Sequence, residues 1–220
     1  MTAEQAAAVY ARLLGAYGPQ HWWPGETQFE VMVGAVLTQN TAWVNVERAL
    51  AALTQRVALS ARAILDLPLA ELAAFLRPVG YFNVKAQRLR ALCEAVEAAG
   101  GLPALERMET AALRHWLLAI HGVGPETADD ILLYAFARPV FVVDAYTRRL
   151  FGRLGLIPPD EGYEAIRHRF EAALGPDTQR FNEYHALIVR HGKAICRPRP
   201  RCEGCGLRAL CAAGDADRPT

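Results

Sequence analysis

Four of the five cysteines lie within sixteen residues near the end of the chain, with the spacing Cys196-x5-Cys202-x2-Cys205-x5-Cys211. Thiolates this close together repel one another unless a cation binds them, so the pattern indicates a metal site. Zinc sites made of four cysteines usually contain two C-x-x-C pairs. Here there is one such pair with a wider step on each side, which suits a larger [4Fe–4S] cluster. We expect the iron–sulfur cluster, with zinc as the alternative.

The segment that carries these cysteines is rich in positive charge. Between positions 186 and 211 there are six basic residues and one acidic residue, although the net charge of the whole chain is only +1. A local excess of cations attracts phosphate backbones, and a merely solvated surface is the alternative. We therefore expect this segment to contact nucleic acid, with the metal as a structural staple rather than a redox catalyst. The remaining cysteine, Cys93, is expected in the core.

A second candidate site is the string Gly122-Val123-Gly124-Pro125. One amphipathic helix is expected to end near Ile120, and Pro125 is suited to the first position of the next helix. The two glycines allow a tight hairpin between them. Its exposed amides would bind an anion, for which a phosphate diester is the natural ligand. A plain pair of helices without a ligand is the alternative.

Asp144 is the candidate catalytic residue. It ends the apolar run Val140–Val143 and precedes a helical pattern, Ala145–Leu150. Its simplest role is that of a helix N-cap. Its place after a buried segment, twenty residues beyond Gly124, also allows a chemical role. Breaking an N-glycosidic bond develops positive charge on the sugar, which a fixed carboxylate stabilises while it orients or deprotonates the attacking water.

The elements that must position these residues are predicted to be helices. Apolar residues recur at helical spacing, and Gly and Pro interrupt the pattern often enough for eight to ten helices. The run Val140–Val143 is too short for a sheet and is expected to be a buried connector. The fold class is therefore all-α. No apolar run approaches ~18 residues and the start lacks a basic leader, so we expect a cytoplasmic protein, associated with the nucleoid, that has no membrane contact.

The order of motifs resembles the helix-hairpin-helix DNA glycosylase superfamily, and within it the endonuclease III branch. The resemblance covers nearly the whole chain, and its matching segments are 37–41, 80–86, 122–129, 143–144 and 191–193, followed by the cysteines. The first cysteine gap is one residue shorter than in that branch. The resemblance implies a monomer that acts on double-stranded DNA containing a damaged base, which it would flip into a pocket.

The resemblance also implies two helical lobes on either side of a DNA cleft. Residues 22–137 would form a helical barrel that ends in the hairpin, residues 1–21 and 138–211 would form the cluster lobe, and 212–220 would be a flexible tail. Asp144 would lie at the cleft. By motif position, Gln39 and Tyr81 would fill the gap left by the flipped base. The residues expected to contact DNA are Gln39, Tyr81, Gly122, Val123, Gly124 and Thr127.

One departure from the branch affects the chemistry. Members that also cut the strand have a lysine two residues after the last hairpin glycine, and its amine forms a Schiff base with the sugar. This chain has Glu126 there, followed by Thr127. A glutamate cannot form that adduct, and only Lys85 and Lys193 remain as amines. We therefore predict a monofunctional glycosylase with weak or absent lyase activity.

A narrower resemblance concerns the base. His21-Trp22-Trp23-Pro24 and the glutamate at position 126 are similar to the bacterial endonuclease III-like 3-methyladenine glycosylases. An N-methylated purine is electron-poor and stacks well on indole rings. The expected base pocket consists of Trp22, Trp23, Pro24, Trp43, Glu126 and Lys193, although tryptophans of this kind also occur as core residues.

Three other functions stay open at this point. The first is a bifunctional endonuclease III-type glycosylase and lyase acting on oxidised pyrimidines. The second is a glycosylase for mismatched thymine or adenine. The third belongs to another class, a catalytically silent DNA-binding module that uses the hairpin only for phosphate contact.

Overall fold

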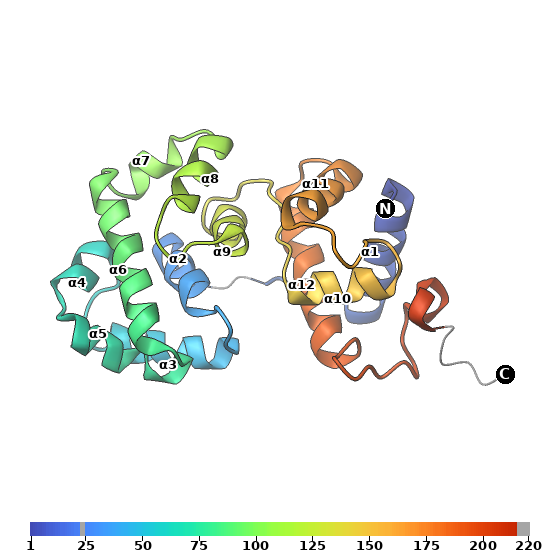
Figure 1. Ribbon diagram of the computed structural model, residues 1–220, viewed down its shortest axis with the longest axis horizontal. Coiled ribbons are helices and arrows are strands. Elements are labelled where there is room, and N and C mark those ends of the chain that lie inside the picture. Colours follow the sequence, from blue (N-terminus) through green and yellow to red (C-terminus); the bar gives the residue numbers. More distant parts are fainter. Residues whose placement is uncertain (23–24, 215–220) are drawn as a thin grey trace. The chain divides into compact units, whose positions relative to one another are not determined.

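The computed structural model describes residues 1–22 and 25–214, which form helices joined by short connections (Figure 1). No β-strand occurs in this part of the chain, so the all-α prediction is confirmed. The helices are α1 Ala3–Tyr17, α2 Gln28–Leu37, α3 Trp43–Thr54, α4 Ala61–Asp66, α5 Leu69–Phe75, α6 Phe82–Ala98, α7 Leu102–Glu106, α8 Thr110–Leu118, α9 Pro125–Asp130, α10 Ala145–Arg153, α11 Tyr163–Leu174 and α12 Thr178–Ala194.

The sequence predicted eight to ten helices, whereas the described residues form twelve α-helices and four shorter helical turns. The additional elements are short. Helices α4, α5, α7 and α9 have five to seven residues each, which is less than two full turns. A periodicity of 3.6 residues is not visible over so few positions, which explains the lower number.

The chain divides into two compact units. The terminal unit consists of Met1–Trp22 and Pro139–Thr220 and contains α1, α10, α11, α12 and the four clustered cysteines, Cys196, Cys202, Cys205 and Cys211. The middle unit, Trp23–Arg138, contains α2 to α9. In the expected tail, Ala212–Gly214 forms the short turn η4, and residues 215–220 lie outside the described residues. No helix in the described part of the chain is both long enough and apolar enough to cross a bilayer.

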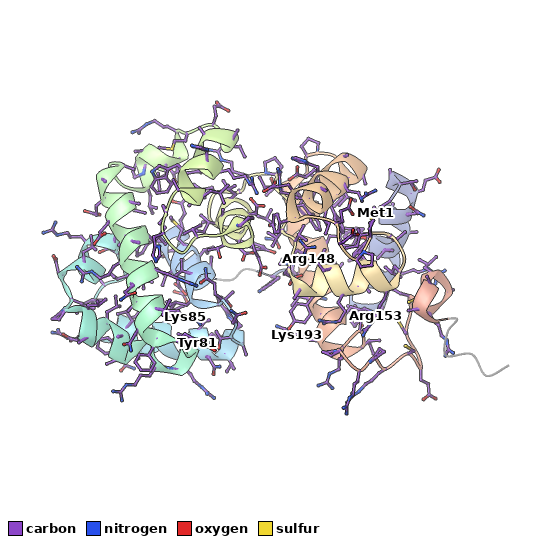
Figure 2. All side chains as sticks on the ribbon, viewed as in Figure 1. Met1, Tyr81, Lys85, Arg148, Arg153 and Lys193 are labelled. Atoms are coloured by element: carbon purple, nitrogen blue, oxygen red, sulfur yellow. The ribbon has the colours of Figure 1, made fainter. Side chains whose placement is uncertain are left out.

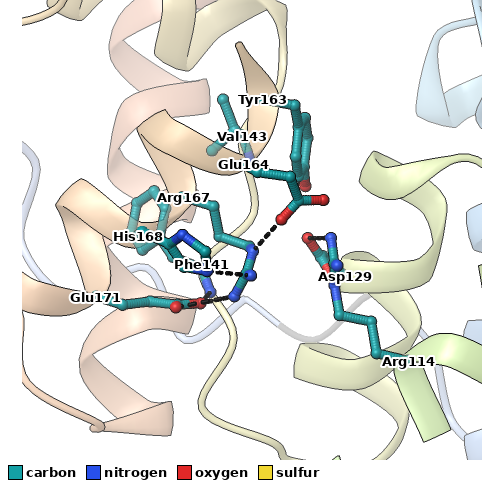
Figure 3. A network of polar contacts seen from close by, with 9 residues as sticks. All are labelled: Arg114, Asp129, Phe141, Val143, Tyr163, Glu164, Arg167, His168 and Glu171. Carbon is teal, nitrogen blue, oxygen red and sulfur yellow. Dashed lines mark hydrogen bonds and ion pairs between the residues drawn. The ribbon is translucent and has the colours of Figure 1, made fainter. Parts of the chain in front are cut away.

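The connector Val140–Val143 is buried, as predicted, and runs in the terminal unit without a β partner. Side chains of α11 satisfy its backbone instead. The Phe141 N–H donates to Glu171 Oε1 at 3.1 Å, and the Val143 N–H donates to the Tyr163 hydroxyl at 3.4 Å. Arg167 holds Glu171 from the other side at 2.8 Å (Figure 3). The connector is thus fixed up to the residue before Asp144.

Aromatic packing fixes the same connector from the core side. The Phe141 ring stacks on Phe170 with centroids 4.1 Å apart and an interplanar angle of 5°. It also meets Phe181 and Tyr184 edge-on. Tyr184 on α12 donates its hydroxyl hydrogen to the carbonyl of Ala6 on α1 at 2.8 Å. One aromatic cluster therefore joins the first helix, the connector and the last long helix.

We expect the Phe141→Ala substitution to destabilise the terminal unit by about 3–5 kcal/mol, because it leaves a cavity in this cluster. Val44→Ala is the control, since Val44 is 49% exposed and its truncation leaves no cavity. Thermal melting of both variants measures the effect. A Phe141→Ala variant that melts with the wild type would contradict the role given to the cluster.

Candidate functional site

The hairpin of the middle unit forms as predicted, with α8 ending at Leu118 and Pro125 as the first residue of α9. Gly122 has φ +85, a conformation that favours glycine. A Cβ built on Gly122 would lie 2.2 Å from Cγ of Arg88, so the α6 side chain packs directly on the turn. Gly124 has φ −92, and nothing lies within 4 Å of a Cβ built there. The turn therefore requires glycine at the first position for conformation and for space.

A buried ion pair joins the two helices of the hairpin. Arg114 on α8 donates from Nε to Asp129 Oδ1 at 2.6 Å and from Nη2 to Oδ2 at 3.1 Å (Figure 3). The Asp129 side chain is fully buried. This two-point contact fixes the planes of both groups and holds α9 in register with α8.

Gln39 lies against the hairpin and is held at both ends of its amide. Its Nε2 donates to the Gly122 carbonyl at 3.0 Å and to the Thr127 hydroxyl at 2.9 Å. Its Oε1 accepts from Arg88 Nη1 at 2.5 Å. Val123, the residue between the glycines, is buried. Arg88 was not predicted as a site residue, because it lies 49 positions from Gln39 and in no motif.

Tyr81 has a different environment. Its side chain is 77% exposed (Figure 2), so Tyr81 is not a core residue. It adopts a left-handed backbone, φ 46 and ψ 32, immediately before α6. Lys85 on the next turn is buried and donates from Nζ to the Val79 carbonyl at 2.8 Å. This contact fixes the turn that presents Tyr81 to solvent.

The two lysine side chains, Lys85 and Lys193, differ in their exposure to solvent. Burial, with a smaller contribution from the Arg88 charge, lowers the pKa of Lys85, but its Nζ is bonded to a carbonyl inside the fold. Lys193 is exposed on α12 of the terminal unit (Figure 2). Glu126 is exposed in the first turn of α9, where an acid is favourable next to the helix dipole.

Asp144 is the N-cap of α10, as the simplest interpretation of the sequence predicted. Its Oδ1 accepts from the Thr147 N–H at 2.7 Å, and its Oδ2 lies 3.5 Å from His185 Nε2. The side chain is 13% exposed. Burial by itself raises the pKa of this carboxyl, but the contact and charge of His185 and the bonds to Thr147 outweigh it and lower the pKa. Asp144 is therefore an anion in a nearly buried position.

His185 is the second residue that the sequence analysis missed. It lies on α12, 41 positions beyond Asp144, and is 4% exposed. The Trp22 ring stacks on it with centroids 5.6 Å apart and an interplanar angle of 24°. A histidine within an otherwise buried helix face is the only signal in the sequence, and such residues are common in protein cores.

The four cysteines of the C-terminal segment line one cavity of about 160 Å³, together with His191 and Arg153. Arg153 Nη1 donates to Cys196 Sγ at 3.3 Å, and His191 Nε2 lies 3.7 Å from Cys205 Sγ. Among the described residues, no three His, Cys, Asp or Glu side chains converge on one point as ligands of a single ion do.

The charges of these thiols act on one another. Burial raises the pKa of Cys205, the thiolates of the other three cysteines raise it further, and the Leu207 N–H opposes this. A cation in the cavity would remove that repulsion. Cys93, by contrast, lies in the core of the middle unit as predicted, and burial raises its pKa to about 12.

The residues expected to form the base pocket come from both units. Trp22 and Lys193 belong to the terminal unit, and Trp43 and Glu126 belong to the middle unit. The Trp43 ring packs on α2, where a Cβ built on Gly34 would lie 3.0 Å from its Cη2. Trp23 and Pro24 lie outside the described residues.

The helices, the hairpin and the anchored carboxylate define a helix-hairpin-helix DNA glycosylase. Residues 33–176 match the family model described as HhH-GPD superfamily base excision DNA repair protein, and the chain belongs to this superfamily. It is a DNA N-glycosylase of base excision repair, and the predicted likeness to the endonuclease III branch is confirmed.

Individual relatives agree with this assignment. A Methanocaldococcus jannaschii protein with the provisional name DNA repair glycosylase is 46% identical over 211 residues, which cover 94% of this chain and 96% of that protein. The H. pylori 3-methyladenine DNA glycosylase bound to 1,N6-ethenoadenine has a TM-score of 0.75 and 30% identity, covering 88% of this chain and 98% of the other. Endonuclease III in a non-covalent DNA complex shares the fold, with a TM-score of 0.84, 22% identity and 98% coverage of both chains.

We expect Gly122→Ala to destabilise the protein by more than the roughly 1–2 kcal/mol of a left-handed backbone, because the new methyl group also collides with Arg88. Gly124→Ala is the matched control, since its backbone is extended and its surroundings are open. Melting temperatures compare the two. Equal stability of both variants would show that the turn has no such constraint.

Proposed function

We propose that this chain is a monofunctional glycosylase that hydrolyses the N-glycosidic bond of alkylated purines such as 3-methyladenine. The observation that carries the proposal is the exposed Glu126 in the first turn of α9, the position at which strand-cutting relatives have a nucleophilic lysine. Neither of the two lysines lies at that position: Lys85 is buried and bonded to a carbonyl, and Lys193 lies on α12. We therefore propose water as the nucleophile.

Asp144 supplies the chemistry in this proposal. As the base leaves, positive charge develops on the sugar, and a preorganised anion in a poorly solvated position stabilises it. The lowered pKa keeps Asp144 ionised, so the same carboxylate can orient the attacking water and accept its proton. N-alkylation has already weakened the glycosidic bond, and one carboxylate then suffices.

In this proposal the middle unit binds the DNA backbone. The hairpin amides around Gly122 and Gly124 hold a backbone phosphate without reading sequence. The target base leaves the stack to reach the pocket, and Gln39 and Tyr81 occupy the space that it leaves. The exposure of Tyr81 and the position of Gln39 beside the hairpin support these roles. Val123 and Thr127 are also proposed to contact the DNA; their side chains are buried, so the contact would be made by the backbone amides of the turn.

Two observations support an alkylated purine as the substrate. The H. pylori relative, 30% identical, is named a 3-methyladenine glycosylase and binds an adenine derivative. In addition, Trp22 presents an indole in the unit that contains Asp144, and indole faces attract electron-poor, cationic rings. Trp43, Glu126 and Lys193, together with Trp23 and Pro24, which lie outside the described residues, stay predictions from the sequence.

We propose a [4Fe–4S] cluster for the cysteine cavity, with zinc as the alternative. All four thiols line one space, and their spacing, one C-x-x-C pair with a wider step on each side, favours the larger cluster. Cys196, Cys202, Cys205 and Cys211 would hold the cluster. It would supply structural cross-linking of the basic C-terminal segment, which contacts the DNA backbone.

The absence of a Schiff base is tested by borohydride trapping with damaged DNA. We expect no covalent adduct with the wild-type protein. The Glu126→Lys variant places an amine in the first turn of α9 and is expected to gain an adduct. A strong adduct with the wild type would identify a bifunctional enzyme and overturn the proposal.

The base specificity is tested with duplexes that contain 3-methyladenine, thymine glycol, G·T or G·A. We expect release of 3-methyladenine, and we expect Asp144→Asn to lower its rate about 10²- to 10⁴-fold while DNA binding is kept. Release of thymine glycol with strand cutting, or of a mismatched base, would favour the corresponding alternative enzyme. No release from any duplex would leave a DNA-binding module.

The cofactor is tested by iron, sulfide and zinc analysis of protein purified without oxygen. We expect a brown protein that contains iron and sulfide, and loss of both on Cys202→Ser. Cys93→Ala is the control and should keep the full iron content, because Cys93 lies in the core of the other unit. A colourless protein with stoichiometric zinc would contradict the cluster.

A further inference from the structure

We infer that His185 is a positioning residue for Asp144, which fixes the orientation of the catalytic carboxylate through the oxygen that the helix cap leaves available. This inference rests on the proposed role of Asp144 and adds a residue to it. His185 does not touch the DNA in this account and acts only through the carboxylate.

The two oxygens of the Asp144 carboxylate have different contacts. The Thr147 N–H occupies Oδ1 at 2.7 Å. One hydrogen bond leaves the Asp144 carboxylate able to turn about its Cβ–Cγ bond, a torsion with a broad energy minimum. His185 Nε2, 3.5 Å from Oδ2, adds the second point that defines the plane. An oxygen that must face a sugar carbon and a water molecule requires such a plane.

The packing around His185 holds this side chain in place. Its side chain is 5% exposed, and the Trp22 ring covers one face. Helices α10 and α12 approach closely about two turns further along α12: a Cβ built on Gly192 of α12 would lie 2.4 Å from Cδ1 of Tyr146 on α10. Arg149 of α10 also donates to the Gly192 carbonyl at 3.2 Å. The two helices that carry Asp144 and His185 are therefore fixed to one another.

The negative charge of Asp144 also requires a partner. An anion that is only 13% exposed loses most of its hydration, which is costly unless nearby groups replace it. His185 provides the largest compensating contact, ahead of Thr147. Both side chains of this contact are nearly buried, His185 at 5% and Asp144 at 13% exposed. His185 thus allows the carboxylate to be anionic where water is scarce.

The test compares His185→Phe with His185→Gln under single-turnover conditions. Phenylalanine keeps a ring that can stack on Trp22 but has no N–H, whereas glutamine keeps a donor of similar reach. We expect His185→Phe to lower the rate of base release about 10²-fold, the loss that follows from a small misplacement of a reacting group. His185→Gln should recover most of the rate. DNA affinity should be unchanged in both variants.

Val189→Ala is the packing control. Val189 lies one turn further along α12 and is 8% exposed, so its truncation disturbs the same helix without touching Asp144. Wild-type rates in His185→Phe, or equal losses in His185→Phe and His185→Gln, would overturn the inference. If the melting curve shows that His185→Phe does not fold, His185→Leu takes its place in the comparison.

The base used in this test is whichever one the wild-type protein releases. If the wild type releases a base other than an alkylated purine, the proposed specificity fails while the comparison of His185 variants proceeds on that base. The two failures are therefore distinguishable.

Discussion

The structure of the terminal unit depends on keeping one carboxylate ionised in a nearly buried position. Asp144 loses hydration there, and three features compensate for it: the Thr147 N–H, His185 and the N-terminus of α10, whose dipole favours an anion. The Thr147 N–H and the helix N-terminus both belong to α10, and His185 comes from α12. The connector brings Asp144 to the start of α10, and the aromatic cluster around Phe141 holds the connector in place.

In the middle unit, a tight turn is held rigid while its backbone stays available to a ligand. Gly122 allows Arg88 to lie directly on the turn, and Arg88 in turn orients Gln39. The Arg114–Asp129 pair fixes the helices on either side. Only Lys85 and Lys193 are lysines among the 24 basic residues of this chain. Arginine is suited to such positions because its planar group makes several directed bonds at once.

Much of this arrangement was predictable from the sequence because its signals are local. The hairpin has glycines and a proline at characteristic spacing, the connector is a short apolar run, and Asp144 stands where an N-cap is expected. His185 and Arg88 were not predictable in the same way. Their partners lie 41 and 49 positions away in the chain, and only the packing of helices brings them together. The left-handed backbone that presents Tyr81 to solvent is likewise not indicated by the sequence around it.

The most direct test of a water nucleophile activated by Asp144 is the order of bond breaking in a single turnover. Base release and strand scission are followed on the same end-labelled duplex by rapid quenching, with one portion of each sample treated with hot alkali. The account predicts that the base is released while the strand stays intact, and that cuts appear only after alkali. Strand scission that keeps pace with base release, without alkali, would contradict it.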